Sequence, residues 1–330
     1  MMGMIFLRMA LLGGALALLA ACLAGAPAQP SLRPIAVQLA WNHQAQFAGI
    51  YAADRAGLYA AEGLAVTVLP GGPGVDKLAP VLSGAAQFGV AGADELILAR
   101  AAGQPVRAIA TIYRRSPIVF VALAETGITR PEEFAGKTIR VADNLVPSLH
   151  AMLAHVGVAP DQYQVVTELP SDLALFASGE VPVWGMYING MYVAVQRAGY
   201  PVNLIFPDDY GVHFYADTLY TTDELIDRDP ELVRRFLRAT LSGWTYAIEN
   251  PGDIASLVAS YAPDADLDVE HAKMIASLPL VNTGEDHIGW MRPDQWETMA
   301  QALHVENLLA APLEISQVYT LQFLEENYTP

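Results

Sequence analysis

The sequence is nearly devoid of cysteine: Cys22 is the only one in 330 residues. A lone cysteine excludes an intramolecular disulfide, a cysteine-based metal site and a Cys-x-x-Cys redox motif. The 7 histidines show neither His-x-x-x-His nor His-Glu-x-x-His spacing, which the common zinc sites require. We therefore expect the protein to work without a metal and without a cofactor.

Positive charge is also scarce. The chain has 18 lysines and arginines against 35 aspartates and glutamates, for a formal net charge of −17. Nucleic-acid binding requires a basic face that neutralises phosphates, and the sequence contains no basic run or basic helix. Nucleic acid is therefore excluded as an expected partner.

The usual nucleotide and nucleophile motifs are absent as well. The loop Gly71-Gly72-Pro73-Gly74 is followed by Lys77-Leu78, which fits neither Gly-x-x-x-x-Gly-Lys-Ser/Thr nor Gly-x-Gly-x-x-Gly. No Gly-x-Ser-x-Gly elbow occurs. We expect this loop, Gly72 included, to line a cleft that its backbone can approach closely.

Long hydrophobic runs are confined to the N-terminus. Arg8, the apolar run Ala10 to Leu19 and the small residues after it predict an export signal over residues 1–21. The run is short for a membrane-spanning helix, and no second one follows, which argues against a polytopic membrane protein.

Leu19-Ala20-Ala21-Cys22 resembles the bacterial lipobox, in which the cysteine becomes the lipidated first residue of the mature protein. An incidental thiol within a signal peptide is the alternative. Residues 22–34 are rich in alanine, proline and glycine and predict a tether. Because one acyl chain anchors a protein only marginally, stable attachment requires multiple acylation. We expect a protein held by Cys22 on the extracytoplasmic face of the cell membrane.

The rest of the chain, with 53% hydrophobic residues overall, is long enough for two lobes. Its opening unit, residues 37–74, predicts a βαβ arrangement with a polar loop (Trp41, Asn42, Gln46) and a glycine-rich loop at the same strand ends. In open α/β sheets ligands bind at that edge.

The order of the predicted elements repeats. Strands and helices alternate up to about residue 215, and Ala177-Ser178-Gly179 before one strand echoes Leu82-Ser83-Gly84 before another. Alternation of this kind favours two α/β lobes with parallel or mixed sheets. We assign 35–115 and 216–330 to lobe 1 and 116–215 to lobe 2, with crossings near 113–118 and 206–217. After Thr222 the pattern is mainly helical, and Asp229-Pro230-Glu231 predicts one helix start.

The candidate ligand contacts fall into three chemical groups. Flat heterocycles stack on aromatic rings, amides read ring carbonyls and nitrogens, and carboxylates accept hydrogen bonds from hydroxyl or amine groups. Each type also has a plain structural use, in the core, in helix caps and in surface turns. The aromatic candidates are Trp41, Tyr113, Trp184, Tyr187, Tyr192 and Tyr210; the amides are Asn42, Gln46, Asn144 and Asn189; the acids are Asp94, at a predicted helix start, Asp208, Asp209 and Asp217.

Taken in order, several segments resemble one known group of proteins. They are the lipobox, Trp41 to Gly49, Gly57 to Tyr59, Glu62 to Leu64, Pro70 to Gly74 and Phe134 to Ile139. The chain is similar over nearly the whole mature sequence to the substrate-binding lipoproteins of ABC importers in the family of thiamine pyrimidine-precursor, sulfonate, taurine and riboflavin binders. The resemblance implies a two-lobed, hinged fold of the periplasmic-binding-protein type. It also implies a small-molecule ligand and a permease and ATPase as partners.

Within that family, the segments 183–190 and 203–212 look most like the riboflavin-binding branch. Pyrimidine binders often carry an acidic residue shortly after the position of Trp184, where this chain offers Asn189. We therefore expect riboflavin as the ligand, with a hydroxymethyl- or formylaminopyrimidine as the alternative.

An enzyme is the alternative of a different class. The same fold family includes a eukaryotic pyrimidine synthase that consumes one of its own residues. That branch carries a cysteine cluster, whereas the only cysteine here lies in the lipobox. Export and lipidation also argue against a cytoplasmic biosynthetic role, so the sequence favours a binding protein.

Overall fold

The computed structural model describes residues 31–305, 307–310 and 313–329. The predicted signal segment, Cys22 and most of the predicted tether lie outside the described residues. Within the described ranges, no helix combines the length and the apolar character that a membrane crossing requires.

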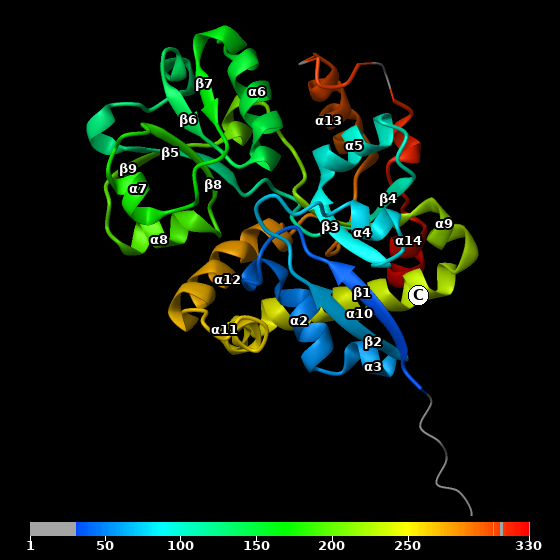
Figure 1. The fold of residues 1–330 in the computed structure, drawn as a ribbon. Helices are drawn as coiled ribbons and strands as arrows, with labels where there is room; N and C mark the ends of the chain where they lie inside the picture. Colours follow the sequence, from blue (N-terminus) through cyan, green and yellow to red (C-terminus); the bar gives the residue numbers. More distant parts are fainter. Residues whose placement is uncertain (1–30, 306, 311–312, 330) are drawn as a thin grey trace, which may run out of the picture. The chain divides into compact units, whose positions relative to one another are not determined.

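The first sheet has five strands in the order β2-β1-β3-β10-β4 (Figure 1). β1 and β3 run parallel, with Val37 opposite Phe88, and β10 runs antiparallel to both β3 and β4. The last strand therefore enters the sheet from the opposite direction, and its first residue lies at the carboxyl end of β3. The bounds are β1 Arg33–Gln38, β2 Leu64–Leu69, β3 Phe88–Gly92, β4 Val106–Thr111 and β10 Asp217–Thr222.

The second sheet repeats this plan with the order β7-β6-β8-β5-β9. β6 is parallel to β7 and β8, and β5 is antiparallel to β8 and β9. Two mixed sheets of similar build therefore form the two lobes that the sequence predicted. The bounds are β5 Ile118–Leu123, β6 Thr138–Arg140, β7 Gln164–Val166, β8 Val183–Tyr187 and β9 Val202–Ile205.

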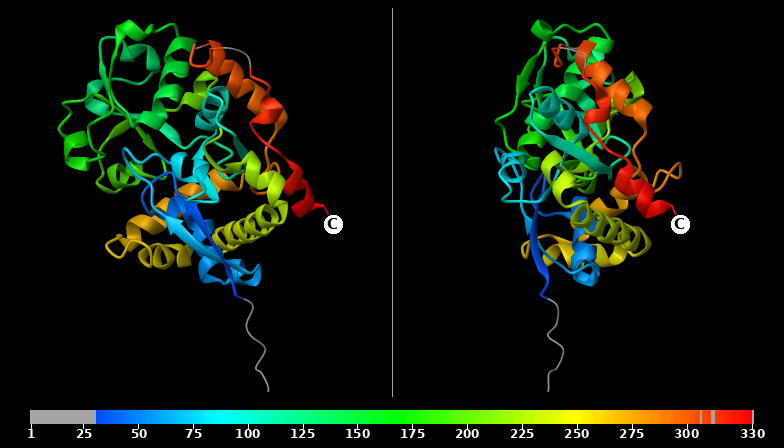
Figure 2. Two further views of the ribbon diagram at one scale, coloured as in Figure 1. Left: turned by 45° about the vertical axis from the view of Figure 1, so that its right-hand side comes forward. Right: turned by 90° about the vertical axis from the view of Figure 1, so that its right-hand side faces the viewer.

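The chain changes sheet twice. It leaves the first sheet between β4 and β5 and returns to it between β9 and β10. The first connection covers residues 112–117 and the second covers residues 206–216. Figure 2 shows the green elements of residues 118–210 gathered around their own sheet in both views.

Most of the helices pack on the first sheet and on each other. The longest, α10, begins where the Asp229 side chain accepts a hydrogen bond from the Leu232 amide, with Pro230 at the first position. The first-lobe helices are α2 Ala48–Arg55, α3 Leu58–Ala61, α4 Ala79–Leu82, α5 Ala93–Ala101, α9 Asp223–Arg228, α10 Pro230–Glu249, α11 Pro251–Ala259, α12 Leu267–Val281, α13 Pro293–Val305 and α14 Gln322–Tyr328.

The contact between α10 and α2 depends on two glycines. A Cβ atom on Gly243 would lie 2.1 Å from the carbonyl oxygen of Gly49, and one on Gly49 would lie 2.2 Å from the Trp244 ring. The two helix backbones therefore approach more closely than any side chain at these positions allows. Nearby, the Phe88 and Phe236 rings stack with their centroids 3.8 Å apart, which ties α10 to β3.

The second lobe carries α6 Val146–His155, α7 Leu173–Ala177 and α8 Met191–Arg197. Here the structure corrects the sequence-based boundaries. The sequence pattern predicts a strand over 181–184 and a helix from Tyr187, whereas the strand runs from Val183 to Tyr187 and the helix begins at Met191. The strand continues beyond Trp184 because Gly185 pairs with Phe120 of β5 in the sheet.

Two other predicted helices are shorter than expected. Only Ala79–Leu82 of the predicted 75–82 segment is helical. The predicted 315–325 helix is divided into a short 3-10 turn, Ile315–Gln317, and α14. Between them the chain is extended along β4: the Ala108 amide donates to the Val318 carbonyl at 2.8 Å, and the Thr320 amide to the Ala108 carbonyl at 3.0 Å. Tertiary pairing has replaced the helical hydrogen bonds.

Candidate ligand-binding site

A cavity of about 310 Å³ is lined by residues of both lobes. This volume lies at the lower end of the roughly 300–1,000 Å³ typical of small-molecule sites. Polar and aromatic lining residues from the first lobe are Trp41, Gln44, Gln46, Lys77, Glu95, Asp217 and Lys273; the second lobe contributes Arg140, Asn144, Ser171 and Tyr187 together with the apolar Met186 and Met191.

The lining residues stand where the topology brings strand ends together. Trp41 follows β1, Arg140 ends β6 and Tyr187 ends β8. Asp217 begins β10, which is antiparallel, so it reaches the same edge as the ends of the parallel strands. The cavity therefore occupies the position expected for ligands in α/β sheets.

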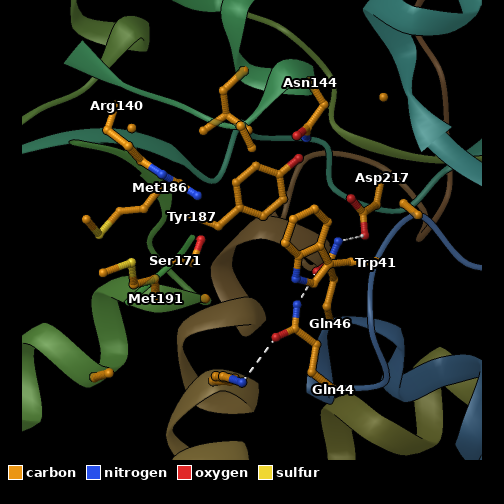
Figure 3. Close-up of a pocket in the computed structure, with 18 of the residues that line it drawn as sticks. Trp41, Gln44, Gln46, Arg140, Asn144, Ser171, Met186, Tyr187, Met191 and Asp217 are labelled. Carbon is orange, nitrogen blue, oxygen red and sulfur yellow. Dashed lines mark hydrogen bonds between the residues drawn. The ribbon is translucent and has the colours of Figure 1, made fainter. Parts of the chain in front are cut away.

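A directed chain of hydrogen bonds runs along one wall (Figure 3). Lys273 Nζ donates to Gln44 Oε1 at 3.1 Å, Gln44 Nε2 to Gln46 Oε1 at 2.5 Å, and Gln46 Nε2 to Asp217 Oδ2 at 2.6 Å. Lys273 also donates to Glu270 Oε1 at 2.6 Å. The chain fixes the orientation of both amides and leaves the second oxygen of Asp217 without a contact to Gln46.

Asp217 is 3% exposed, and burial raises the pKa of its carboxyl to about 7, although the Gln46 hydrogen bond opposes the shift. Asp94 is 5% exposed, and burial together with the neighbouring Glu95 charge raises its pKa to about 7 as well. Lys77 neutralises Glu95 directly, with Nζ 2.8 and 3.0 Å from the two carboxylate oxygens. Asp217, which lines the cavity, therefore changes its protonation state near neutral pH.

Aromatic and amide groups occupy the middle of the cavity. In the view of Figure 3, the rings of Trp41 and Tyr187 lie between Arg140 and Asp217, with Asn144 beside them. Burial and the Asp217 charge raise the pKa of Tyr187 well above its usual value, so its hydroxyl stays protonated. Two rings facing one space suit a flat ligand, and a neutral phenol can donate or accept a hydrogen bond.

A buried polar contact joins the two lobes beside the cavity. Asn189, just after β8, donates from Nδ2 to the Tyr113 hydroxyl and to Ser277 Oγ on α12, both at 2.8 Å. Tyr113 in turn donates to the Gln46 carbonyl at 3.2 Å. Asn189 Oδ1 is buried without a partner in the described part of the chain. This contact sets the separation of the lobes next to the ligand space.

The structure brings part of the sequence-predicted set together. Trp41, Gln46, Asn144, Tyr187 and Asp217 line the cavity. Five further candidates lie in the first lobe or in the contact between the lobes without lining the cavity: exposed Asn42, which covers Gly72, and buried Gly72, Asp94, Tyr113 and Asn189. Ligand contact by these five stays a prediction.

The remaining candidates do not line the cavity: Trp184, Tyr192, Asp208, Asp209 and Tyr210. Trp184 is fully buried within the second lobe, where its Nε1 donates to the Val181 carbonyl at 3.0 Å and its ring meets Phe176 edge-on. It is removed from the cavity because β8 continues three residues beyond it, to Tyr187. Asp209 and Tyr210 lie in the 3-10 turn Pro207–Tyr210, away from the residues that line the cavity.

The sequence reasoning missed Arg140, Lys77, Glu95 and Lys273. Arg140 had a signal, since a charged residue between Ile139 and Val141 at a predicted strand end has no place in a purely apolar core. Lys273 had none, because it reaches the cavity from α12, more than 200 residues from Gln44 in sequence. Among the described residues, no cluster of three or more His, Cys, Asp or Glu side chains is arranged to hold a metal ion.

Comparison with known proteins gives a consistent set of relatives. The NMT1/THI5-like family matches residues 44–254. The riboflavin-binding protein RibY of Chloroflexus aurantiacus is 27% identical over 90% of this chain and 88% of its own. The formylaminopyrimidine-binding protein of Halalkalibacterium halodurans is 26% identical over 88% of this chain and 90% of its own.

Two further similarities concern chemistry and fold. A protein of Legionella pneumophila named 4-amino-5-hydroxymethyl-2-methylpyrimidine phosphate synthase is 24% identical over 88% of this chain and 92% of its own. The periplasmic aliphatic sulphonate binding protein SsuA of Escherichia coli superposes with a TM-score of 0.68 at 14% identity, over 86% of this chain and 91% of its own. At that identity the likeness shows the fold alone, which is the two-lobed fold of periplasmic binding proteins.

Proposed function

Since the chain belongs to the NMT1/THI5-like family, we propose that it is the substrate-binding protein of an ABC importer and that its ligand is riboflavin. The observation that carries the proposal is the cavity between two mixed sheets, with Trp41 and Tyr187 facing its centre and polar groups at both ends. The similarity to RibY supports the choice of ligand. Closure of the two lobes buries the ligand and presents it to the permease and ATPase.

Each part of riboflavin has a partner in this cavity. The flat ring system packs against Trp41 and Tyr187, and the amide of Asn144 is placed to read ring carbonyls and nitrogens. Asp217 accepts hydrogen bonds from the hydroxylated chain with the oxygen that Gln46 leaves free. The hydrogen-bond chain from Lys273 through Gln44 and Gln46 holds Asp217 in place before the ligand arrives, which lowers the ordering cost of binding.

A thiamine pyrimidine precursor is the second candidate. The specific observation in its favour is that two carboxylates, Asp217 and Glu95, line the cavity and can accept from a ring amine. The relative that is named as a formylaminopyrimidine-binding protein supports it as well. The small cavity volume of about 310 Å³ also suits this smaller ligand.

We propose binding rather than catalysis. The eukaryotic synthase branch of the same fold family carries a cysteine cluster, and this chain has one cysteine, at position 22. The cavity walls offer acids, amides, aromatic rings and basic side chains, all of which can hold a heterocycle by hydrogen bonds or stacking. We further propose that Cys22 carries the lipid anchor that holds the protein on the outer face of the cell membrane. Replacing Cys22 by serine should then leave the precursor unlipidated, which metabolic labelling with a fatty acid measures.

Titration of the purified protein with riboflavin, followed by flavin fluorescence, tests the ligand. Stacking on Trp41 and Tyr187 should quench the flavin strongly and saturably at one site per chain. Absence of quenching together with tight calorimetric binding of formylaminopyrimidine would move the protein to the second candidate. Absence of binding to both ligands would contradict the proposal as a whole.

A further inference from the structure

Arg140 is a buried cation without an acidic partner. It is 4% exposed and lines the cavity from the second lobe. No carboxylate of the residues described here forms an ion pair with it, whereas Lys77 and Lys273 on the same cavity each pair with a glutamate. A charge that is withdrawn from water without a counter-charge is costly, so proteins retain one where a ligand supplies the missing partner.

The protein holds this guanidinium in place but does not use all of its donors. Nε and Nη2 both donate to the Leu169 carbonyl, at 2.9 and 2.7 Å. The guanidinium carbon lies 5.2 Å from the centroid of the Trp184 ring, so the ring stabilises the group by a cation–π contact. A guanidinium has five N–H donors in a planar fork, so donors remain for the cavity. In Figure 3 these nitrogens point inward beside Met186 and Tyr187.

The opposite end of the cavity presents the oxygens of the Asp217 carboxyl. Asp217 lies on the first lobe, and in the view of Figure 3 the Tyr187 ring lies between it and Arg140. A ligand that fills the space therefore meets donors at one end and acceptors at the other. This polarity decides which way round a long ligand enters.

We propose that Arg140 is the specificity-determining residue of this site and that it binds a negatively polarised oxygen on the ligand. This inference rests on the proposed binding function but not on riboflavin in particular. In riboflavin the oxygen is a ring carbonyl, in the formylated pyrimidine it is the formyl oxygen, and in a phosphorylated flavin it is a phosphate oxygen. The Trp184 ring and the Leu169 carbonyl orient the fork, so Trp184 acts on the ligand only through Arg140.

The test compares Arg140→Met and Arg140→Lys with Arg130→Met, which removes an exposed arginine of the same lobe. The wild type and the three variants are each titrated with four ligands: riboflavin, lumichrome, riboflavin 5′-phosphate and formylaminopyrimidine. For whichever of these binds to the wild type, Arg140→Met should weaken binding by about tenfold to a hundredfold, as expected for a hydrogen bond to a charged group. Arg140→Lys should recover part of the loss, and Arg130→Met should change nothing.

The ligand series distinguishes the source of the oxygen. An equal loss for riboflavin and lumichrome, which lacks the hydroxylated chain, assigns the contact to a ring carbonyl. A loss confined to the 5′-phosphate assigns it to a formal anion, and either result supports the inference. Unchanged affinity of Arg140→Met for a ligand that binds to the wild type overturns it.

Thermal melting of the ligand-free proteins separates this role from a structural one. The Leu169 hydrogen bonds and the Trp184 ring offset only part of the cost of burying a charge without a counter-charge, so Arg140→Met should melt at or above the wild-type temperature. A marked fall in melting temperature would show that Arg140 serves the fold, and would overturn the inference. If none of the four ligands binds to the wild type, the proposed function fails, and this melting comparison still decides the role of Arg140.

Discussion

Asp217→Asn should change the pH dependence of stability in a way that the structure specifies. In the folded protein burial raises the pKa of Asp217 from 3.8 to about 7. Because the folded-state value lies above the unfolded one, the group favours folding only while it is protonated. Its contribution is complete below pH ~4 and is lost as the pH rises to about 7. Asparagine keeps the oxygen that accepts from Gln46 and cannot ionise.

The magnitude follows from the size of the shift. A change from 3.8 to about 7 is roughly three pH units, and at ~1.36 kcal/mol per unit this corresponds to about 4 kcal/mol. The free energy of unfolding of Asp217→Asn, minus that of the wild type, should therefore increase by up to about 4 kcal/mol between pH 4 and pH 8. Asp94 carries a similar shift, but it is present in both proteins and contributes to both curves.

Urea unfolding of the ligand-free proteins at half-unit pH steps measures this difference. Asp209→Asn is the matched control, because Asp209 is exposed, and its difference from the wild type should stay flat. A flat curve for Asp217→Asn between pH 4 and pH 8 would refute the reasoning, since it would mean that Asp217 is as well solvated in the fold as in the unfolded chain.

Three further substitutions test the site and the packing around it. Trp41→Ala should weaken riboflavin binding several-fold or more, because the lost stacking alone costs about 1 kcal/mol, and flavin titration measures this. The same substitution should change the free energy of unfolding in urea only slightly. Trp184→Ala should lower the free energy of unfolding by about 3–5 kcal/mol, because it empties a fully buried site, and a neutral effect on stability would contradict its position in the core. Gly243→Ala should destabilise the protein strongly, since its Cβ would lie 2.1 Å from the Gly49 oxygen, whereas Gly252→Ala has nothing within 4 Å and should be tolerated. Equal melting temperatures for those two variants would be inconsistent with the close approach of α10 and α2.

The amino-acid sequence by itself determined the fold class and the edge of the sheet at which the ligand space forms. Apolar segments that alternate with polar or glycine-bearing loops specify α/β units. The carboxyl ends of parallel strands then lie at the same edge of the sheet, whichever side chains they carry. Trp41, Gln46, Asn144, Tyr187 and Asp217 were predicted as contacts from the ligand groups that their side chains can bind, and all five line the cavity. The start of α10 at Asp229-Pro230 could also be predicted from the sequence, because a helix cap and a first-turn proline act locally.

Tertiary structure alone decided which side chains share the cavity and with what charge. Lys273 comes from α12 and meets Gln44 across more than 200 residues, a contact that no local pattern encodes. The register of β8 carries Trp184 into the core and Tyr187 to the edge, because Gly185 pairs with Phe120 within the sheet. Burial, which depends on the whole fold, is what leaves the Arg140 guanidinium without a counter-charge and raises the pKa of Asp217 to about 7.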